Sequence, residues 1–150
     1  MIRGQYFEEF TVGQKLETVG RTITETDVVN FAALSGDYNR IHTDAAFAAT
    51  TPFGQRIAHG MCVSAIASGL VVRTNIMEGT VLAFREINEW KFSKPVFFGD
   101  TIHVDAHVID VKALPRVGGG AVTIKLEVIN QKDEVCQTGR WTVLMLSKPK

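Results

Sequence analysis

The chain has 150 residues, of which 45% are hydrophobic and 21% are charged, the composition of an ordinary globular protein of one domain. We therefore expect a single domain over residues 1–150. Sixteen Lys and Arg residues balance sixteen Asp and Glu residues, so the formal net charge is zero. This balance argues against a nucleic-acid partner, which needs an excess of cations, and against a polybasic membrane anchor.

The cysteine content and the N-terminus indicate a reduced protein. Only Cys62 and Cys136 are present, whereas disulfide scaffolds and structural zinc sites need more cysteines at closer spacing. Residues 1–6 lack the apolar core of a signal peptide. We therefore expect a cytoplasmic location.

Residues 16–36 predict a strand followed by a capped helix. The strand covers residues 16–23. Thr24 is suited to cap the helix and Asp27 to return a hydrogen bond from the third helical position, a pattern called a capping box. Gly36 is suited to end the helix. Apolar residues behind the cap lie near helical spacing, namely Val28, Phe31, Ala32 and Leu34.

A second helix is predicted from about His59 or Gly60 to Asn75. The longest apolar run, residues 57–72, has 16 residues, fewer than the about 20 that span a membrane. Its apolar residues leave no clearly polar face, which predicts a helix covered on nearly all sides. Residues 37–57, between the two helices, are irregular, with at most a short helix over residues 44–49.

Four strands are predicted in the second half of the chain, at residues 80–94, 101–113, 121–130 and 135–147. Turns at residues 118–120 and 131–134 join the later strands, and such short connections favour antiparallel pairing. We therefore expect an α+β fold in which a curved antiparallel sheet wraps the buried central helix. Because one sheet of this size covers a helix incompletely, we expect pairing with a second copy.

Asp37 and His42 are the first candidates for catalysis. They lie five positions apart in the irregular segment, so a curled loop can bring the carboxylate and the imidazole together. Such a pair can hold a water molecule and take its proton, which is typically worth about 10²–10⁴ in rate. Asn39 can anchor the loop through bonds to the backbone. The alternative is structural, with Asp37 as a turn residue after Gly36 and His42 filling a gap.

Neither a metal nor a nucleotide cofactor is expected. His103, Asp105 and His107 share one strand face and are metal-ligand types, but an exposed polar face explains them equally well. The glycines at 118–120 lack the strand–glycine–helix context of a nucleotide-binding loop.

Several segments are similar to those of one protein family. Residues 35–42 read SGDYNRIH, and Phe47 and Ala48 follow them. This run closely resembles the hydratase motif of the MaoC-like family, the (R)-specific enoyl-CoA hydratases, in which a small residue, Gly and Asp precede Asn, Pro, an aliphatic residue and His. The likeness covers nearly the whole chain in order and continues through residues 51–54, 56–61, 68–70 and 94–101.

The resemblance implies a hot-dog fold, in which a sheet wraps a long central helix and two subunits pair their sheets. It also implies reversible addition of water to a trans-2-enoyl thioester, giving the (3R)-hydroxyacyl product. On the matched positions, Asp37 and His42 are the pair that binds and activates the water, and Asn39 holds the loop. Gly60 is implied to donate its N–H to the thioester oxygen, a role that the unpaired amides and partial positive charge of a helix N-terminus favour. Ser68 matches a helix serine that helps position the active-site groups, and it also fits a small packing residue.

The sequence differs from the family motif at Arg40, where the motif has proline. Without proline the loop is less rigid, and a cation lies near both catalytic candidates. Arg40 either points to solvent or contacts the coenzyme A phosphates or a charged substrate tail. His59, just before the central helix, is expected to cap that helix or to fix the loop. Candidates for phosphate contact are Arg21, Arg56, Arg73, Arg85, Lys91 and Lys94, with Arg56 included in the expected substrate-binding set.

The predicted function is therefore a hydro-lyase acting on an acyl-CoA thioester, as a homodimer or a larger even-numbered assembly. Acyl length and the choice between coenzyme A and acyl carrier protein stay open. A thioesterase on the same fold is disfavoured, because such enzymes usually place a carboxylate on or beside the central helix and residues 60–75 contain no Asp or Glu. A non-catalytic acyl-thioester binding module is disfavoured by the presence of both Asp37 and His42.

Overall fold

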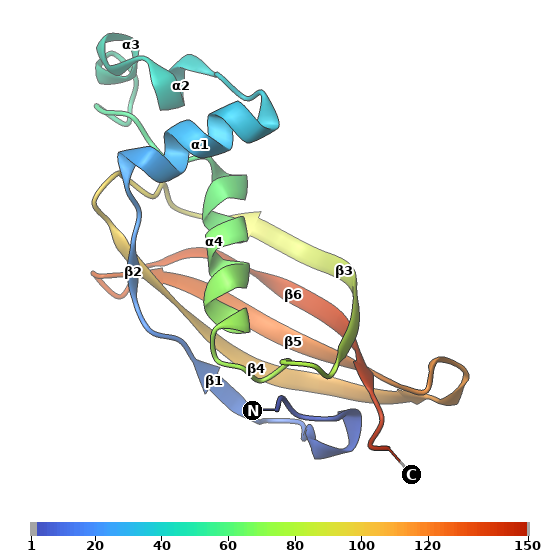
Figure 1. The fold of residues 1–150 in the computed structure, drawn as a ribbon. Coiled ribbons are helices and arrows are strands. Elements are labelled where there is room, and N and C mark those ends of the chain that lie inside the picture. Colours follow the sequence, from blue (N-terminus) through green and yellow to red (C-terminus); the bar gives the residue numbers. More distant parts are fainter. Residues whose placement is uncertain (1–2, 150) are drawn as a thin grey trace.

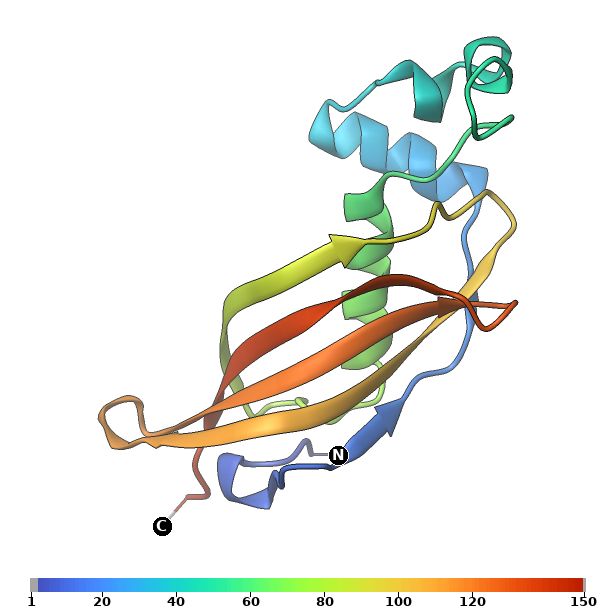
Figure 2. The same ribbon diagram turned by 180° about the vertical axis from the view of Figure 1, so that it is seen from behind.

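The fold is one curved antiparallel sheet wrapped around one long helix (Figures 1 and 2). The computed structural model describes residues 3–149. The strand order is β1-β4-β5-β6-β3, and β2 also pairs with β4. The strands are β1 (Lys15–Glu17), β2 (Arg21–Thr22), β3 (Val81–Phe92), β4 (Thr101–Leu114), β5 (Gly119–Asn130) and β6 (Val135–Leu146). The helix inside the sheet is α4 (Gly60–Val72). The α+β hot-dog arrangement expected from the sequence is confirmed.

The core lies between α4 and the inward face of the sheet. Residues of β4 alternate between buried and more exposed, as their sequence predicts for a strand with one covered face. Each aliphatic side chain buried there stabilises the fold by about 1.5–3 kcal/mol. The buried residues of β4, β5 and α4 include Ile102, Val104, Val108, Val122, Leu126, Val63, Ala67 and Leu70.

The helix α1 (Glu25–Ser35) begins with the predicted capping box. The Thr24 hydroxyl oxygen accepts a hydrogen bond from the Asp27 N–H at 3.2 Å, and the Asp27 carboxylate accepts one from the Thr24 N–H at 2.8 Å. Gly36 ends the helix with a φ of 78°, in the left-handed region that glycine adopts without steric cost. Local sequence signals therefore set both ends of α1.

Three helices gather at the amino end of α4. They are α1 and two short helices of the segment expected to be irregular, α2 (Arg40–Thr43) and α3 (Ala45–Ala49). Figure 1 shows them at one end of the molecule, with β1 and the N-terminus at the other. The segment that contains Asp37 and His42 therefore lies over the start of the central helix.

Two predicted elements differ in the structure. The strand expected at 16–23 is divided into β1 and β2, because the Thr18 hydroxyl accepts the hydrogen bond of the Val104 N–H at 2.9 Å in place of a backbone carbonyl. The turn expected at residues 118–120 lies earlier. Residues Pro115–Val117 form a 3-10 turn, and Gly118, with a φ of 69°, closes it.

The central helix ends at Val72, three residues before the predicted end, and is not covered on nearly all sides within one chain. Met61 is 59% exposed and Val72 is 55% exposed, because the sheet covers only one side of α4. None of the helices in residues 3–149 combines the length and apolarity needed to cross a membrane.

Replacing Thr24 by Ala removes the acceptor of the Asp27 N–H, and we expect it to lower the free energy of unfolding by about 1 kcal/mol. Thr24→Ser keeps the hydroxyl and should lose much less. Urea titrations followed by circular dichroism measure both variants. Equal losses would show that the Thr24 methyl group, and not the hydrogen bond, stabilises the start of α1.

Candidate active site

Two successive polar turns place Asp37 and His42. Asp37 follows Gly36, and its carboxylate accepts a hydrogen bond from the Asn39 N–H at 3.1 Å. The Asn39 side-chain oxygen accepts one from the Ile41 N–H at 3.1 Å and so caps α2. Short polar side chains commonly fold the backbone in this way. As a result, His42 lies on the first turn after the loop, close to Asp37.

The His42 imidazole is buried, and one hydrogen bond sets its tautomer. Its Nδ1 lies 2.7 Å from the carbonyl oxygen of Ile57. Because a carbonyl only accepts, Nδ1 carries the proton and the neutral ring keeps its lone pair on Nε2. Burial lowers the pKa of His42 below its ordinary value, and the neighbouring His59 adds to this effect. A neutral His42 can therefore accept a proton at Nε2 near pH 7.

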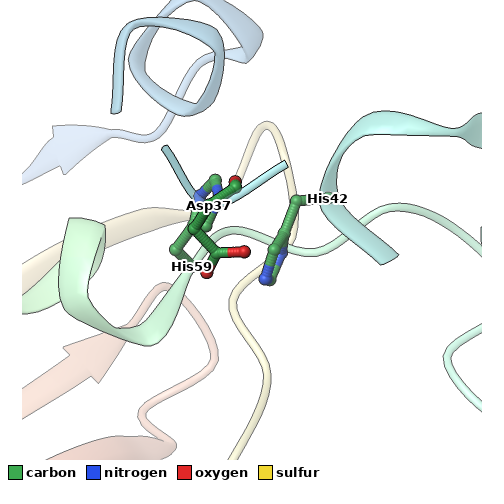
Figure 3. Close-up of side chains that lie close together, drawn as sticks. All are labelled: Asp37, His42 and His59. Atoms are coloured by element: carbon green, nitrogen blue, oxygen red, sulfur yellow. The ribbon is translucent and has the colours of Figure 1, made fainter. Parts of the chain in front are cut away.

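Asp37, His42 and His59 form one cluster at the amino end of α4. Each contributes an oxygen or nitrogen atom to a group in which all atoms lie within 4.8 Å of one another. Figure 3 shows the Asp37 carboxylate directed toward the His42 ring. The loop therefore brings together the carboxylate and the imidazole of the sequence hypothesis.

His59 connects this loop to the central helix. Its Nε2 lies 2.9 Å from the backbone carbonyl oxygen of Asp37, so Nε2 carries the proton and donates. Its ring packs on that of His42, with the centroids 3.8 Å apart and the planes inclined by 31°. The side chain makes no hydrogen bond to the start of α4. Of the two roles expected for His59, the structure therefore has the loop contact and not the cap.

The residue types of this cluster are also those that ligate metal ions. Nδ1 of His42 and Nε2 of His59 each donate to a backbone carbonyl oxygen, so both rings are oriented by protein groups alone. A second group joins Glu17, His103 and Asp105, all at least partly exposed, and leaves His107 out.

A cavity of about 540 Å³ opens beside His42. Its wall is mostly apolar. The lining residues are Ile41, His42, Phe53, Ile57, Ala58, Gly60, Met61, Val63, Phe92, Ser93, Lys94, Pro95, Val96 and Gln137.

Gly60 begins α4 at the wall of this cavity. The first amides of a helix have no partners within the helix and lie at its partially positive end. No side chain of residues 3–149 caps this helix start, so the amides are available to a ligand. A Cβ at position 60 would lie 2.7 Å from the ring of Phe92, so any larger residue there would require that ring to shift.

Ser68 and Arg40 do not reach the cavity. The Ser68 hydroxyl donates to the Ala65 carbonyl oxygen at 2.9 Å, two turns along α4 from Gly60. The Arg40 guanidinium pairs with Asp44 at 2.8 Å and lies 4.3 Å from the Phe47 ring centre. The Arg40 side chain is 65% exposed, as the solvent-facing alternative expected, and it also links α2 to α3 through Asp44.

Arg56 also lies outside the main cavity, beside a smaller hollow of about 250 Å³. Its guanidinium pairs with Glu25 at 2.6 Å and lies 4.9 Å from the Phe98 ring centre. The Glu25 carboxylate therefore already pairs with the Arg56 guanidinium, which was expected to contact substrate.

Sequence reasoning missed a hydrogen-bonded group formed by Gln137, Ser64 and Trp90, of which Gln137 lines the cavity. Gln137 lies on β6, far along the chain from the motif. The one available signal was a carboxamide in a strand that otherwise turns mainly apolar residues inward.

Comparison with known proteins adds independent evidence. The family model described as the MaoC-like domain matches residues 8–130. Protein MaoC of Klebsiella aerogenes is 43% identical over 100 residues, which cover 67% of this chain and 29% of that protein. The (R)-specific enoyl-CoA hydratase of Aeromonas caviae is 32% identical over 136 residues, which cover 91% of this chain and 96% of the relative.

A solved structure gives the same result for the fold. The X-ray structure of an Archaeoglobus protein described as a monoamine oxidase regulatory protein superposes with a TM-score of 0.91 at 39% identity. The superposition covers 99% of this chain and 98% of that one.

The lowered pKa of His42 predicts loss of stability in acid. In the unfolded chain the histidine has its ordinary pKa of about 6.5, so as the pH falls the unfolded state binds the proton first. The free energy of unfolding should therefore decrease below about pH 6.5 and level off below the folded-state pKa. Urea titrations between about pH 7 and 5 measure this slope. His42→Gln should flatten it and His107→Gln should not. An unchanged slope in His42→Gln would contradict the assignment to His42.

Proposed function

Because the chain belongs to the MaoC-like domain family, we propose that it is an (R)-specific enoyl-CoA hydratase, which reversibly adds water to a trans-2-enoyl-CoA to give the (3R)-hydroxyacyl-CoA. Its relatives are named as hydratases and dehydratases, which are lyases. The observation that carries the proposal is that the Asp37 carboxylate lies within 4.8 Å of a ring nitrogen of His42, whose Nε2 keeps its lone pair, beside the uncapped start of α4.

The proposed reaction uses these groups together. A water molecule is held between the Asp37 carboxylate and Nε2 of His42, and Nε2 takes one of its protons as the water oxygen bonds to C3. Negative charge then develops on the thioester oxygen, where the Gly60 N–H and the positive end of α4 stabilise it. Return of the proton to C2 completes the addition, and the reverse sequence removes water. One such N–H donor commonly contributes about 10²–10³ in rate.

The remaining site residues are proposed to bind substrate or to support the loop. The apolar cavity wall suits the acyl chain. Asn39 holds the loop in its curled conformation through its hydrogen bond to the Ile41 N–H. The Arg40–Asp44 ion pair restrains the loop where the family motif has a rigid proline. Ser68 packs below the site. Lys94, which lines the cavity, and Arg56, which precedes the lining residue Ile57, are proposed contacts for the phosphates of the carrier.

We further propose that the protein forms a homodimer through β3. This strand is an edge of the sheet and pairs with β6 on one side only within residues 3–149. Exposed apolar edge strands readily pair with another chain. Phe92 of β3 and Met61 of α4 both line the cavity, so a second copy on this edge would also cover the site. The exposed apolar residues of β3 are Val81, Leu82, Phe84, Ile87 and Phe92.

Asp37→Asn and His42→Gln keep the approximate shape of each side chain and remove its acid–base ability. Each should lower the rate of crotonyl-CoA hydration by about 10² or more. The loss of enoyl thioester absorbance measures hydration, and a thiol reagent measures hydrolysis. Asp110→Asn and His107→Gln, matched changes on β4, should keep the wild-type rate. Release of free thiol by the wild type would identify a thioesterase, and full activity in either site variant would refute the proposed pair.

Ile87→Lys should disrupt the proposed dimer, because it places a charge on the apolar edge of β3. Sedimentation equilibrium should then give the monomer mass for this variant and twice that mass for the wild type. Val19→Lys introduces the same exposed charge near the other edge of the sheet and should stay dimeric. A wild-type monomer, or an Ile87→Lys dimer, would refute this interface.

A further inference from the structure

Gln137 makes an unusual set of contacts for a residue in the wall of an apolar cavity. Its side chain is on β6, and the residue is 2% exposed. Its amide nitrogen donates to the Gly60 carbonyl oxygen at 2.9 Å. Its amide oxygen accepts from the Ser64 hydroxyl at 2.7 Å and from the Trp90 indole N–H at 3.2 Å. One carboxamide therefore joins β6, β3 and the first turn of α4.

The orientation of this carboxamide is determined by its partners. The indole N–H of Trp90 only donates, and the Gly60 carbonyl only accepts, so the amide oxygen must face Trp90 and the nitrogen must face Gly60. The Trp90 ring is held in turn by stacking on Trp141, with centroids 5.7 Å apart and planes inclined by 15°. Gln137 is thus a fixed donor to the first turn of the helix.

This donor acts on the peptide group that follows Gly60. The Ser64 hydroxyl lies 3.1 Å from the same carbonyl, but its single proton goes to the closer Gln137 oxygen, so the Gln137 amide is the side-chain donor to the Gly60 carbonyl. Donors to a carbonyl oxygen polarise the peptide unit and strengthen its N–H, which here belongs to Met61. Gly60 and Met61 both line the cavity, and their amides are among the unpaired ones at the helix start. Gln137 therefore polarises one of the amides that would face a bound thioester.

We propose that Gln137, assisted by Ser64, is a positioning residue for the amides at the start of α4 that bind the thioester oxygen. This inference rests on the proposed hydratase function. Burying a carboxamide costs free energy unless its hydrogen bonds are made, and an apolar residue at position 137 would fill the wall without that cost. A role in holding and polarising the first turn of α4 accounts for the carboxamide.

Two variants at position 137 test this inference. Gln137→Leu removes all three hydrogen bonds and should lower kcat for crotonyl-CoA hydration by about 10- to 100-fold, because small displacements of binding groups have effects of that size. KM should change much less. The Val63 N–H donates to the His59 carbonyl oxygen at 3.1 Å in the first turn of α4, so its hydrogen exchange, measured by NMR, should become faster in the same variant, which is a readout independent of activity.

Gln137→Glu adds a pH-dependent test. A protonated carboxyl can donate to Gly60 and accept from Ser64 and Trp90, whereas a carboxylate cannot donate. Burial raises the pKa of a carboxyl group, so the switch should fall within a measurable pH range. We expect kcat of Gln137→Glu to approach the wild-type value at low pH and to fall as the pH rises. The other titratable cavity residues, His42 and Lys94, are present in the wild type and so cancel in the ratio of the two profiles.

The controls separate this inference from the proposed function. Gln14→Leu and Gln14→Glu alter a carboxamide that bonds to Gln5, near the N-terminal strand, and should leave kcat unchanged. An active wild type with full kcat in Gln137→Leu, or a pH-independent ratio for Gln137→Glu, would overturn the positioning role. A wild type inactive on every enoyl thioester, with faster amide exchange in Gln137→Leu, would instead refute the hydratase function.

Discussion

The hydrogen bond from His42 Nδ1 to the Ile57 carbonyl is the contact on which the site depends. It fixes which ring nitrogen keeps a lone pair, and it holds that ring in a buried position that disfavours the protonated form. The two segments are joined in both directions, since the Ile57 N–H donates to the Ile41 carbonyl oxygen at 3.2 Å. These bonds attach α2 to the segment around Ile57 that leads into α4. They also fix the orientation of the His42 ring.

Stability and chemistry are therefore assigned to different parts of the molecule. The sheet and the inner side of α4 supply the buried apolar area, while the polar groups of the site lie on short turns at one end of that helix (Figure 1). Loops placed on a rigid scaffold commonly carry functional residues. Gln137 connects the two parts, because it extends from near the start of β6 to the first turn of α4.

Local signals were enough to predict some features of the fold and site and not others. The Thr24–Asp27 cap and the Gly36 stop involve residues at most a few positions apart, so their spacing predicts the geometry. The spacing of Asp37 and His42 fitted either a catalytic pair or two structural residues, and the family resemblance favoured the pair. The Arg40–Asp44 pair is also local, with the two residues four positions apart, but Arg40 was predicted to face solvent or contact substrate because it replaces the proline of the motif. Gln137 could not be predicted, because its partner Gly60 is 77 positions away and only the strand order brings them together.

The two long helices of this chain begin in opposite ways, and the difference has a chemical meaning. The first turn of α1 contains Glu25 and Asp27, and Thr24 caps it. The first turn of α4 contains no acidic residue, and its preceding residue, His59, turns its ring to the Asp37 loop. A capping side chain there would add about 1 kcal/mol of stability, but its oxygen would occupy the amides. Leaving that helix start uncapped therefore keeps its N–H groups and positive end for a negatively charged oxygen of the substrate.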